Sequence, residues 1–217
     1  MVSLHIDGYE TVGALRAVVK WAGESRGKMH GSSTWDLGRE LPKADPSAFL
    51  RHVDAWNADF PNFSTWGAAA SVWQDRGMLP LDAIALSINA AKWGIQTLLS
   101  SGHTLNEAAS RCTIRLASTT DIISTAAAIR GLRVAFASMI EELGCDPESA
   151  PLWIESRTTS IYGVSDIIED NLLRHTLMAY GAVLGGADSI EVRRHDFISP
   201  AEDDTVASEQ AIRWSRN

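Results

Sequence analysis

Residues 156–197 hold the stretch that most constrains the fold, because strand, helix and strand patterns follow one another there. Residues 151–155, just before it, form a short apolar run bounded by turn-forming residues, which is typical of a buried strand. Apolar residues then recur at helical spacing over residues 172–183. Gly185 and Gly186 end that helix, since glycine adopts left-handed backbone angles without steric cost, and residues 189–192 resume a strand. The stretch predicts one βαβ unit, a building block of parallel sheets and barrels.

The remaining chain shows the same alternation of strand and helix patterns. Strands are predicted over residues 2–6, 27–33, 63–73 and 112–116, and helices over residues 12–21, 46–59, 79–99 and 121–143, with a short helix after the capping-box residue Thr104. The sequence thus offers about six βα units, whereas a closed barrel of the TIM type has eight. We therefore expect an α/β fold, a TIM-type (β/α) barrel that is partial or short. The missing strands would come from a partner or from unrecognised strands in the N-terminal third, and an open barrel leaves strand edges that another chain can pair with.

Two predicted helices have apolar faces that we expect to be buried. On helix 79–99 these residues are Leu81, Ile84, Ala85, Ile88, Ala91, Ile95, Leu98 and Leu99. On the helix that ends at Gly185 they are Leu172, Leu173, Thr176, Ala179, Tyr180 and Val183.

Composition excludes several classes of function. A chain of 217 residues suits a single domain over 1–217, and its net charge of −8 makes a nucleic-acid groove improbable. The two cysteines, Cys112 and Cys145, form no Cys-x-x-Cys pair, so no metal site is predicted. Residues 1–10 lack the features of a signal peptide, and no uninterrupted apolar run is long enough to span a bilayer. We expect a soluble cytoplasmic protein.

Several motifs occur in a recognisable order. They are Arg-Thr-Thr-Ser at 157–160, Asn-x-x-Arg-x-Thr at 171–176, Leu-Gly-Gly-Ala-Asp-Ser at 184–189 and Asp-Phe at 196–197. Together they resemble the barrel domain of the cobalamin-dependent acyl-CoA mutases, the methylmalonyl-CoA mutase family. Residues 211–217 are similar to the Ala-Arg-Ile-Ala-Arg-Asn run of that family, and residues 128–133 sit where it has a Lys-Leu-Arg-Ala-x-Arg helix. The resemblance is better over 61–217 and weaker over 1–60.

The resemblance implies a reaction that depends on adenosylcobalamin and rearranges an acyl-CoA. In the family, cobalamin is held on a separate domain by an Asp-x-His-x-x-Gly motif, which surrounds none of the six histidines here. We therefore expect a partner chain to bind the cofactor. The family's catalytic Tyr-His pair corresponds to Trp73 and Gln74, which supply neither a tyrosine hydroxyl nor a group that titrates near neutral pH. Gly-Gly-Ala-Asp-Ser replaces the catalytic Gly-Gly-Thr-Gln-Ser, as it does in the family's non-catalytic small subunit.

Polar residues at strand ends and on the facing helices are candidates for binding an acyl-CoA. The set is Arg157, Thr158, Thr159, Ser160, Arg130, Arg133, Arg174 and Ser189. Arginines there could clamp phosphates or a carboxylate, and the hydroxyls could donate to a carbonyl. The alternatives are ion pairs, such as Arg174 with Asp170 one turn away, and caps of the following loop. Asn171 is interpreted as a structural cap, and Asp196 as a solvated loop carboxylate rather than a site residue.

Three hypotheses follow for the function. The first is a non-catalytic subunit that completes a heterodimer with a cobalamin-binding mutase chain, the large subunit. The second is the substrate-binding catalytic chain of a split mutase, which acts with a separate cobalamin-binding chain. The third is a stand-alone barrel module with a binding or assembly role.

Overall fold

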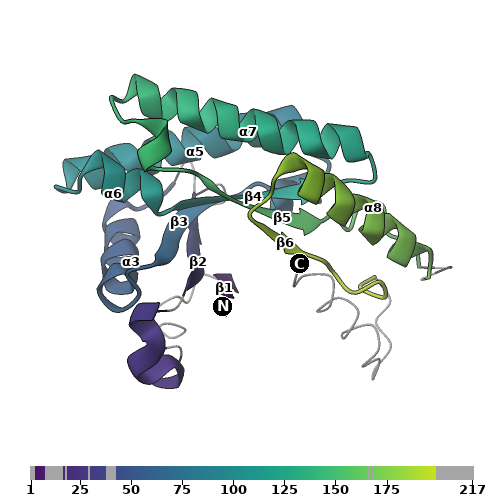
Figure 1. Cartoon of the computed structure of the whole chain (residues 1–217), viewed down its shortest axis with the longest axis horizontal. Coiled ribbons are helices and arrows are strands. Elements are labelled where there is room, and N and C mark those ends of the chain that lie inside the picture. The colour runs from purple at the N-terminus through teal and green to yellow at the C-terminus, as the bar shows by residue number, and fades with distance from the viewer. Residues whose placement is uncertain are drawn as a thin grey trace. The chain divides into compact units, whose positions relative to one another are not determined.

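The computed structural model describes residues 3–7, 17, 19–28, 30–37, 43–165, 167 and 169–198. The strands are β1 (Ser3–Asp7), β2 (His30–Asp36), β3 (Phe63–Ala69), β4 (Cys112–Ser118), β5 (Trp153–Thr158) and β6 (Ser189–Glu191). The helices are α3 (Pro46–Asp59), α4 (Ser71–Gln74), α5 (Pro80–Ser100), α6 (Leu105–Ser110), α7 (Ile122–Glu142) and α8 (Asp170–Gly185), with 3-10 turns η1 (Gly23–Lys28) and η2 (Pro147–Ser149) (Figure 1).

Among the described residues the strands form one sheet in the order in which they occur in the sequence, β1 to β6. The pairs β1–β2, β2–β3 and β5–β6 are parallel. Helices separate the strands, as parallel pairing requires. This confirms an α/β fold with parallel strands, consistent with a partial TIM-type barrel. The predicted helix over 12–21 and the motif at 211–217 lie largely or wholly outside the described residues.

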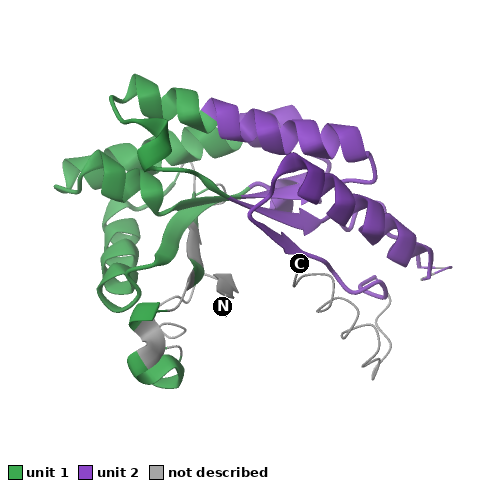
Figure 2. Cartoon of the chain, viewed as in Figure 1, with its two compact units in different colours: residues 1–69, 86–114, 136–153 green, residues 70–85, 115–135, 154–217 purple. Residues whose placement is uncertain are grey.

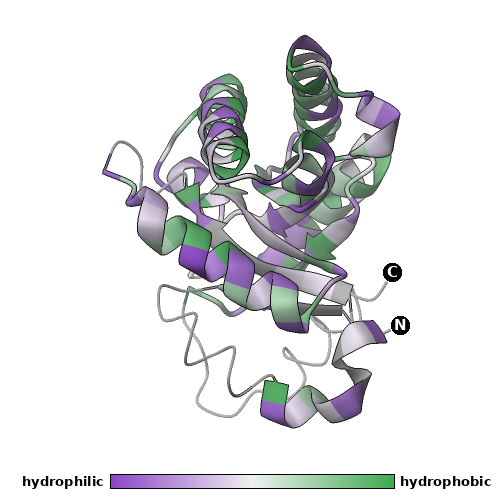
Figure 3. Ribbon diagram, turned by 90° about the vertical axis from the view of Figure 1, so that its left-hand side faces the viewer, coloured by the Kyte–Doolittle hydropathy of each residue, from purple (hydrophilic) through white to green (hydrophobic). Residues whose placement is uncertain are grey.

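The predicted helix caps are confirmed. Asp45 precedes Pro46, and its Oδ1 accepts a hydrogen bond from the Ser47 N–H at 2.9 Å, so α3 begins where the sequence indicates. At α6, Glu107 N donates to Thr104 Oγ1 at 3.3 Å, and the Thr104 N–H donates to the Glu107 carboxylate at 3.0 Å. Both bonds of the capping box are therefore present. The helices in Figure 3 carry hydrophobic and hydrophilic residues in turn along their length, as amphipathic helices do.

The contacts divide the chain into two compact units (Figure 2). Unit 1 comprises residues 1–69, 86–114 and 136–153, and unit 2 comprises residues 70–85, 115–135 and 154–217. Unit 1 is built on an aromatic cluster of Trp56, Phe60 and Phe63. In it the Trp56 and Phe63 rings stack with centroids 5.8 Å apart, and Phe60 and Phe63 lie 4.8 Å apart.

In unit 2, helix α8 buries a different face from the predicted one. Leu173, Tyr180 and Val183 are 65%, 54% and 57% exposed. The buried residues are Asn171, His175, Met178, Gly181, Ala182 and Gly185. The reason is close contact with α7, which lies beside α8 in Figure 1: a Cβ atom added at Gly185 would lie 2.9 Å from the Ile129 Cβ. The face of α8 that carries the small residues thus packs against α7, and the larger apolar residues of α8 are exposed to solvent.

The apolar stripe predicted for α5 is only partly buried. Leu81 and Leu99 are 76% and 37% exposed, whereas Ala91, Ile95 and Leu98 are buried, together with Ala83 and Ser87. The segment 63–73, predicted to hold a strand, contains β3, and residues 71–74 form α4. Helix α7 is long and apolar enough to cross a membrane by length and composition alone, a property that core helices of soluble proteins share.

Candidate functional site

The candidate site lies in unit 2, where strands β4, β5 and β6 end beside the residues that follow α4. Ser118, the last residue of β4, shares a hydrogen bond of 2.5 Å with Ser156 of β5, and its carbonyl accepts from the Thr159 N–H at 3.1 Å. The Arg193 N–H, just beyond β6, donates to Thr158 Oγ1 at 2.9 Å. Parallel strands bring their carboxyl ends to one edge of a sheet, the edge at which barrel proteins place functional groups.

Along one face of these strands runs a row of ion pairs, which we name the charge ladder. Its members are Arg115, Glu155, Arg157, Glu191, Arg193 and Asp75. Side chains two residues apart in a strand point to the same face, so Glu155 and Arg157 share a face of β5. Glu191 and Arg193 are spaced in the same way along β6 and the residues after it.

Each arginine of the charge ladder holds one carboxylate. Arg115 donates from Nε at 2.9 Å and from Nη2 at 2.5 Å to Glu155 Oε2, and both residues are buried, at 5% and 4% exposure. Arg157 donates from the same two nitrogens to Glu191 Oε1, at 2.9 and 2.7 Å. The β5–β6 register sets these two residues opposite each other. Such charge-assisted bonds through two nitrogens fix orientation as well as distance.

The third pair ends the ladder at Asp75. Arg193 Nη2 donates to Asp75 Oδ2 at 2.6 Å. The other oxygen, Oδ1, accepts from the Thr159 hydroxyl at 2.5 Å and from the Ser160 N–H at 3.0 Å. Burial by itself raises the pKa of Asp75, but these hydrogen bonds and the charge of Arg193 outweigh it and hold that pKa below its usual value. Asp75 is therefore a carboxylate held in its ionised form.

The residues at the family's Tyr-His position are both engaged. Gln74 is buried, and its Oε1 accepts a hydrogen bond from the Ala117 N–H at 2.8 Å, which joins α4 to the end of β4. The guanidinium of Arg76 lies 5.1 Å from the centroid of the Trp73 ring. The side-chain carbonyl of Gln74 is thus occupied by a backbone N–H. A catalytic role for either residue stays a prediction.

The predicted acyl-CoA residues fall into two groups. Arg157, Thr158, Thr159 and Ser160 lie together at the carboxyl ends of the strands, in the contacts described above. Arg130 and Arg133 instead lie at the C-terminal end of α8. Arg130 donates to the Leu184 carbonyl and Arg133 donates to the Gly186 carbonyl, each at 2.7 Å. Cationic donors at a helix C-terminus satisfy its last carbonyls.

The two other candidates also lie apart from Arg157 and its neighbours. Ser189 begins β6, opposite Glu155, and so lies at the other end of the strand. Arg174 Nη1 lies 3.8 Å from Asp170 Oδ2, one turn away on α8. This is the local ion pair predicted as the alternative to ligand binding. Binding of an acyl-CoA by any of these residues stays a prediction.

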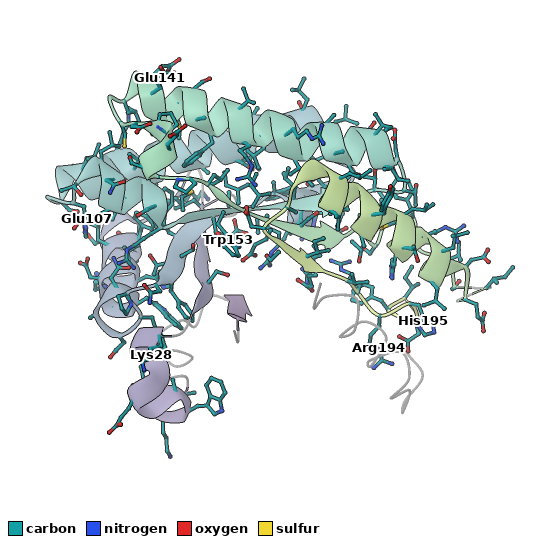
Figure 4. The ribbon with its side chains drawn as sticks, in the orientation of Figure 1. Lys28, Glu107, Glu141, Trp153, Arg194 and His195 are labelled. Carbon is teal, nitrogen blue, oxygen red and sulfur yellow. The ribbon has the colours of Figure 1, made fainter. Side chains whose placement is uncertain are left out.

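Two further interpretations can be compared with the structure. Asn171 is structural, as predicted, because its side chain bonds the N–H and the carbonyl of Val164 and the carbonyl of His195, at 3.0, 2.9 and 2.8 Å. The interpretation of Asp196 as a solvated carboxylate is wrong. It is 1% exposed and accepts bonds of 2.8 and 2.6 Å from Arg194. Arg194 and His195 are labelled in Figure 4, in the segment that follows β6.

Most residues of the charge ladder were not predicted as site residues. One signal was present: Glu-Ser-Arg at 155–157 and Glu-Val-Arg at 191–193 repeat a Glu-x-Arg pattern in two successive strands. Alternating spacing puts both charges of each motif on one strand face, so two neighbouring strands can pair them. Asp75 gives no comparable signal because it comes from a distant loop.

A buried histidine adjoins the ladder from the helical side. His175 of α8 is buried, and desolvation is the main reason that its pKa lies below its usual value. A hydrogen bond with the backbone of Arg193 acts in the opposite direction, whereas the charges of Arg193 and His195 lower the pKa further. His175 is therefore a neutral packing residue.

The described residues contain no group of three or more His, Cys, Asp or Glu side chains that could hold a metal ion. The sequence also lacks the family's cobalt-ligand motif Asp-x-His-x-x-Gly.

Comparison with known proteins identifies the family. The family model of methylmalonyl-CoA mutase matches residues 44–217. Proteins named probable methylmalonyl-CoA mutase small subunit, from Mycobacterium bovis and Mycobacterium tuberculosis, are each 30% identical over 174 residues, which is 80% of this chain. The chain belongs to the methylmalonyl-CoA mutase family. It spans 26% of the length of these relatives.

Proposed function

We propose that this chain is a non-catalytic component, of the small-subunit type, of an acyl-CoA mutase. In this proposal its partner is a cobalamin-binding mutase chain, the large subunit, which binds adenosylcobalamin and acyl-CoA and performs the rearrangement. The names of the relatives, which call them small subunits, support the assignment. A reducing cytoplasm is the compartment we propose, in keeping with two cysteines that are both free thiols.

The observation that carries the proposal is how the polar groups at the strand ends are used. All six charged side chains of the charge ladder are paired with one another, and Gln74 bonds a backbone N–H. A catalytic acid or base needs access to a substrate proton and a pKa near the working pH. Asp75, with its lowered pKa and its three donors, has neither. The arrangement suits a scaffold better than a reaction centre.

The first test is the mass of the purified chain in solution, measured by light scattering alone and after mixing with a cobalamin-binding mutase chain. We expect a one-to-one complex with the mutase chain and no complex with an unrelated protein of similar size and charge. A monodisperse monomer that ignores the mutase chain would overturn the proposal.

The second test separates a silent subunit from the catalytic chain of a split mutase. Thr159→Val removes the hydroxyl that donates to Asp75, and so alters one of the predicted substrate residues. In the assembled complex, we expect kcat for conversion of methylmalonyl-CoA to stay within about twofold of wild type, a barrier change of about 0.4 kcal/mol. A loss of a hundredfold, with complex formation and thermal midpoint retained, would instead favour the catalytic chain.

A further inference from the structure

Three hydrogen-bond donors of different kinds converge on one carboxylate in unit 2. They are the Arg193 guanidinium at 2.6 Å, the Thr159 hydroxyl at 2.5 Å and the Ser160 N–H at 3.0 Å. Both carboxylate oxygens are engaged, Oδ2 by the guanidinium and Oδ1 by the two other donors. Proteins that bind free carboxylates use the same donor types, because a cation and short charge-assisted bonds together replace the hydration of the anion.

The donors are held in place independently of the carboxylate. The Arg193 backbone N–H is fixed by Thr158, at 2.9 Å, and its guanidinium lies 4.6 Å from the centroid of the Phe197 ring. The side chain of Arg193 is nine-tenths buried, and its Nε is buried without a hydrogen-bond partner among the described residues. Thr159 is anchored to the end of β4 through its own N–H. The three donors to Asp75 and the unused Arg193 Nε–H therefore form a preorganised set that does not depend on the carboxylate for its position.

The carboxylate itself comes from a surface loop. Asp75 follows α4, and the next two residues, Arg76 and Gly77, are exposed. Gly77 has φ of +98°, a left-handed turn that glycine adopts readily and that redirects the chain toward α5. The donors, in contrast, come from the ends of β5 and β6. The occupant and its receptor thus belong to separate elements of unit 2.

We propose that Arg193, Thr159 and the Ser160 N–H form a binding site for a small carboxylate ion, and that Asp75 is the resident plug of this site. The plug is tethered, so its effective concentration exceeds that of ordinary dissolved ligands and keeps the site closed in the wild-type chain. Removing the plug carboxylate opens a site selective for carboxylates over simple halide ions. This inference does not depend on the subunit role, and either can fail without the other.

The test uses Asp75→Ala in the full chain with acetate as the probe. The thermal midpoint is measured from 0 to 100 mM sodium acetate at pH 7, with sodium chloride added to constant ionic strength. We expect acetate to raise the midpoint of Asp75→Ala by roughly 3 °C at the highest concentration, as for a ligand of about 10 mM affinity that binds only the folded state. Wild type should not respond, because Asp75 fills the site.

Two further variants locate the effect. Asp75→Ala combined with Arg193→Met should lose the acetate response, since the cation is gone. Asp75→Asn keeps a planar side chain in the loop and should show no response, or one several-fold smaller than that of Asp75→Ala.

The proposal is overturned if folded Asp75→Ala responds to acetate no more than to chloride, or if the response survives loss of Arg193. Should Asp75→Ala fail to fold in chloride, recovery of its far-UV circular dichroism signal on addition of acetate would support the site. The absence of recovery would count against the carboxylate site. The contacts of Asp75 would then only stabilise the fold.

Discussion

The two units of this chain differ in their most distinctive contacts. Unit 1 packs aromatic rings: Trp56 and Phe63 stack, and Phe49 meets Trp66 edge-on with centroids 5.8 Å apart. Unit 2 carries three arginine–carboxylate pairs on one strand face, and its helices meet through glycines. Ring packing depends on excluding water, whereas a buried ion pair depends on both partners staying charged. The units should therefore respond differently to loss of a side chain, to salt and to pH.

The largest effect on stability is expected from breaking the Arg115–Glu155 pair, the most buried ion pair of the charge ladder. Glu155→Leu leaves the Arg115 guanidinium buried without its carboxylate. We expect a loss of about 3 to 5 kcal/mol in the free energy of unfolding, measured by urea denaturation. The double variant Arg115→Met with Glu155→Leu removes both charges, and it should regain most of that loss because apolar replacement of a whole buried pair is often neutral. A double variant as unstable as the single one would show that the pair itself stabilises unit 2.

A smaller effect is expected from the corresponding change in unit 1. Phe63→Leu keeps an apolar side chain but removes a ring that contacts both Trp56 and Phe60. The free energy of unfolding should fall by roughly 1 to 2 kcal/mol. The same loss should be measured in low and high salt, since no charge is involved. A strong salt dependence of this loss would contradict the contrast between the units.

The smallest effect is expected in the pH dependence of stability. The pKa of His175 lies below its usual value of 6.5, so the folded state keeps the histidine neutral where the unfolded state takes up a proton. Stability should therefore fall as the pH drops below about 6.5 and through the folded pKa, by at most about 1.4 kcal/mol per pH unit. His175→Gln should flatten this slope between pH 7 and pH 5. His103→Gln, in unit 1, is the control for general loss of a histidine, and an unchanged slope in His175→Gln would refute the assignment.

Features with local causes could be predicted from the sequence. The cap at Asp45, the capping box at Thr104 and the order of strands and helices depend on neighbouring residues, and the structure confirms them. The end of α8 is of the same kind, since Gly186 has φ of +79°. The motifs that indicate the family are short and ordered, so they too could be recognised without the fold.

Features that depend on packing partners could not be predicted. Periodicity shows that a helix has an apolar side, but Gly181 and Gly185, not the larger apolar residues, let α8 approach α7. The burial of Asp196 follows from Arg194, a neighbour whose direction the sequence does not reveal. The Glu-x-Arg repeat alone does not specify which charges pair, because the pairing depends on the β5–β6 register. The contact of Asp75 with Arg193 depends on the path of a distant loop.

The charge ladder also favours one alignment of strand β6 on β5. This strand has three residues, so its backbone bonds alone would hold several alignments on β5 almost equally well. A slip of two residues in one direction would set Arg157 against Arg193 and Glu155 against Glu191, and like charges directly opposite each other repel. A slip of two residues in the other direction would separate Arg157 from Glu191. A slip of one residue would turn every side chain to the wrong face. The ion pair between Arg157 and Glu191 thus favours the native register of β6, because each of these slips loses it.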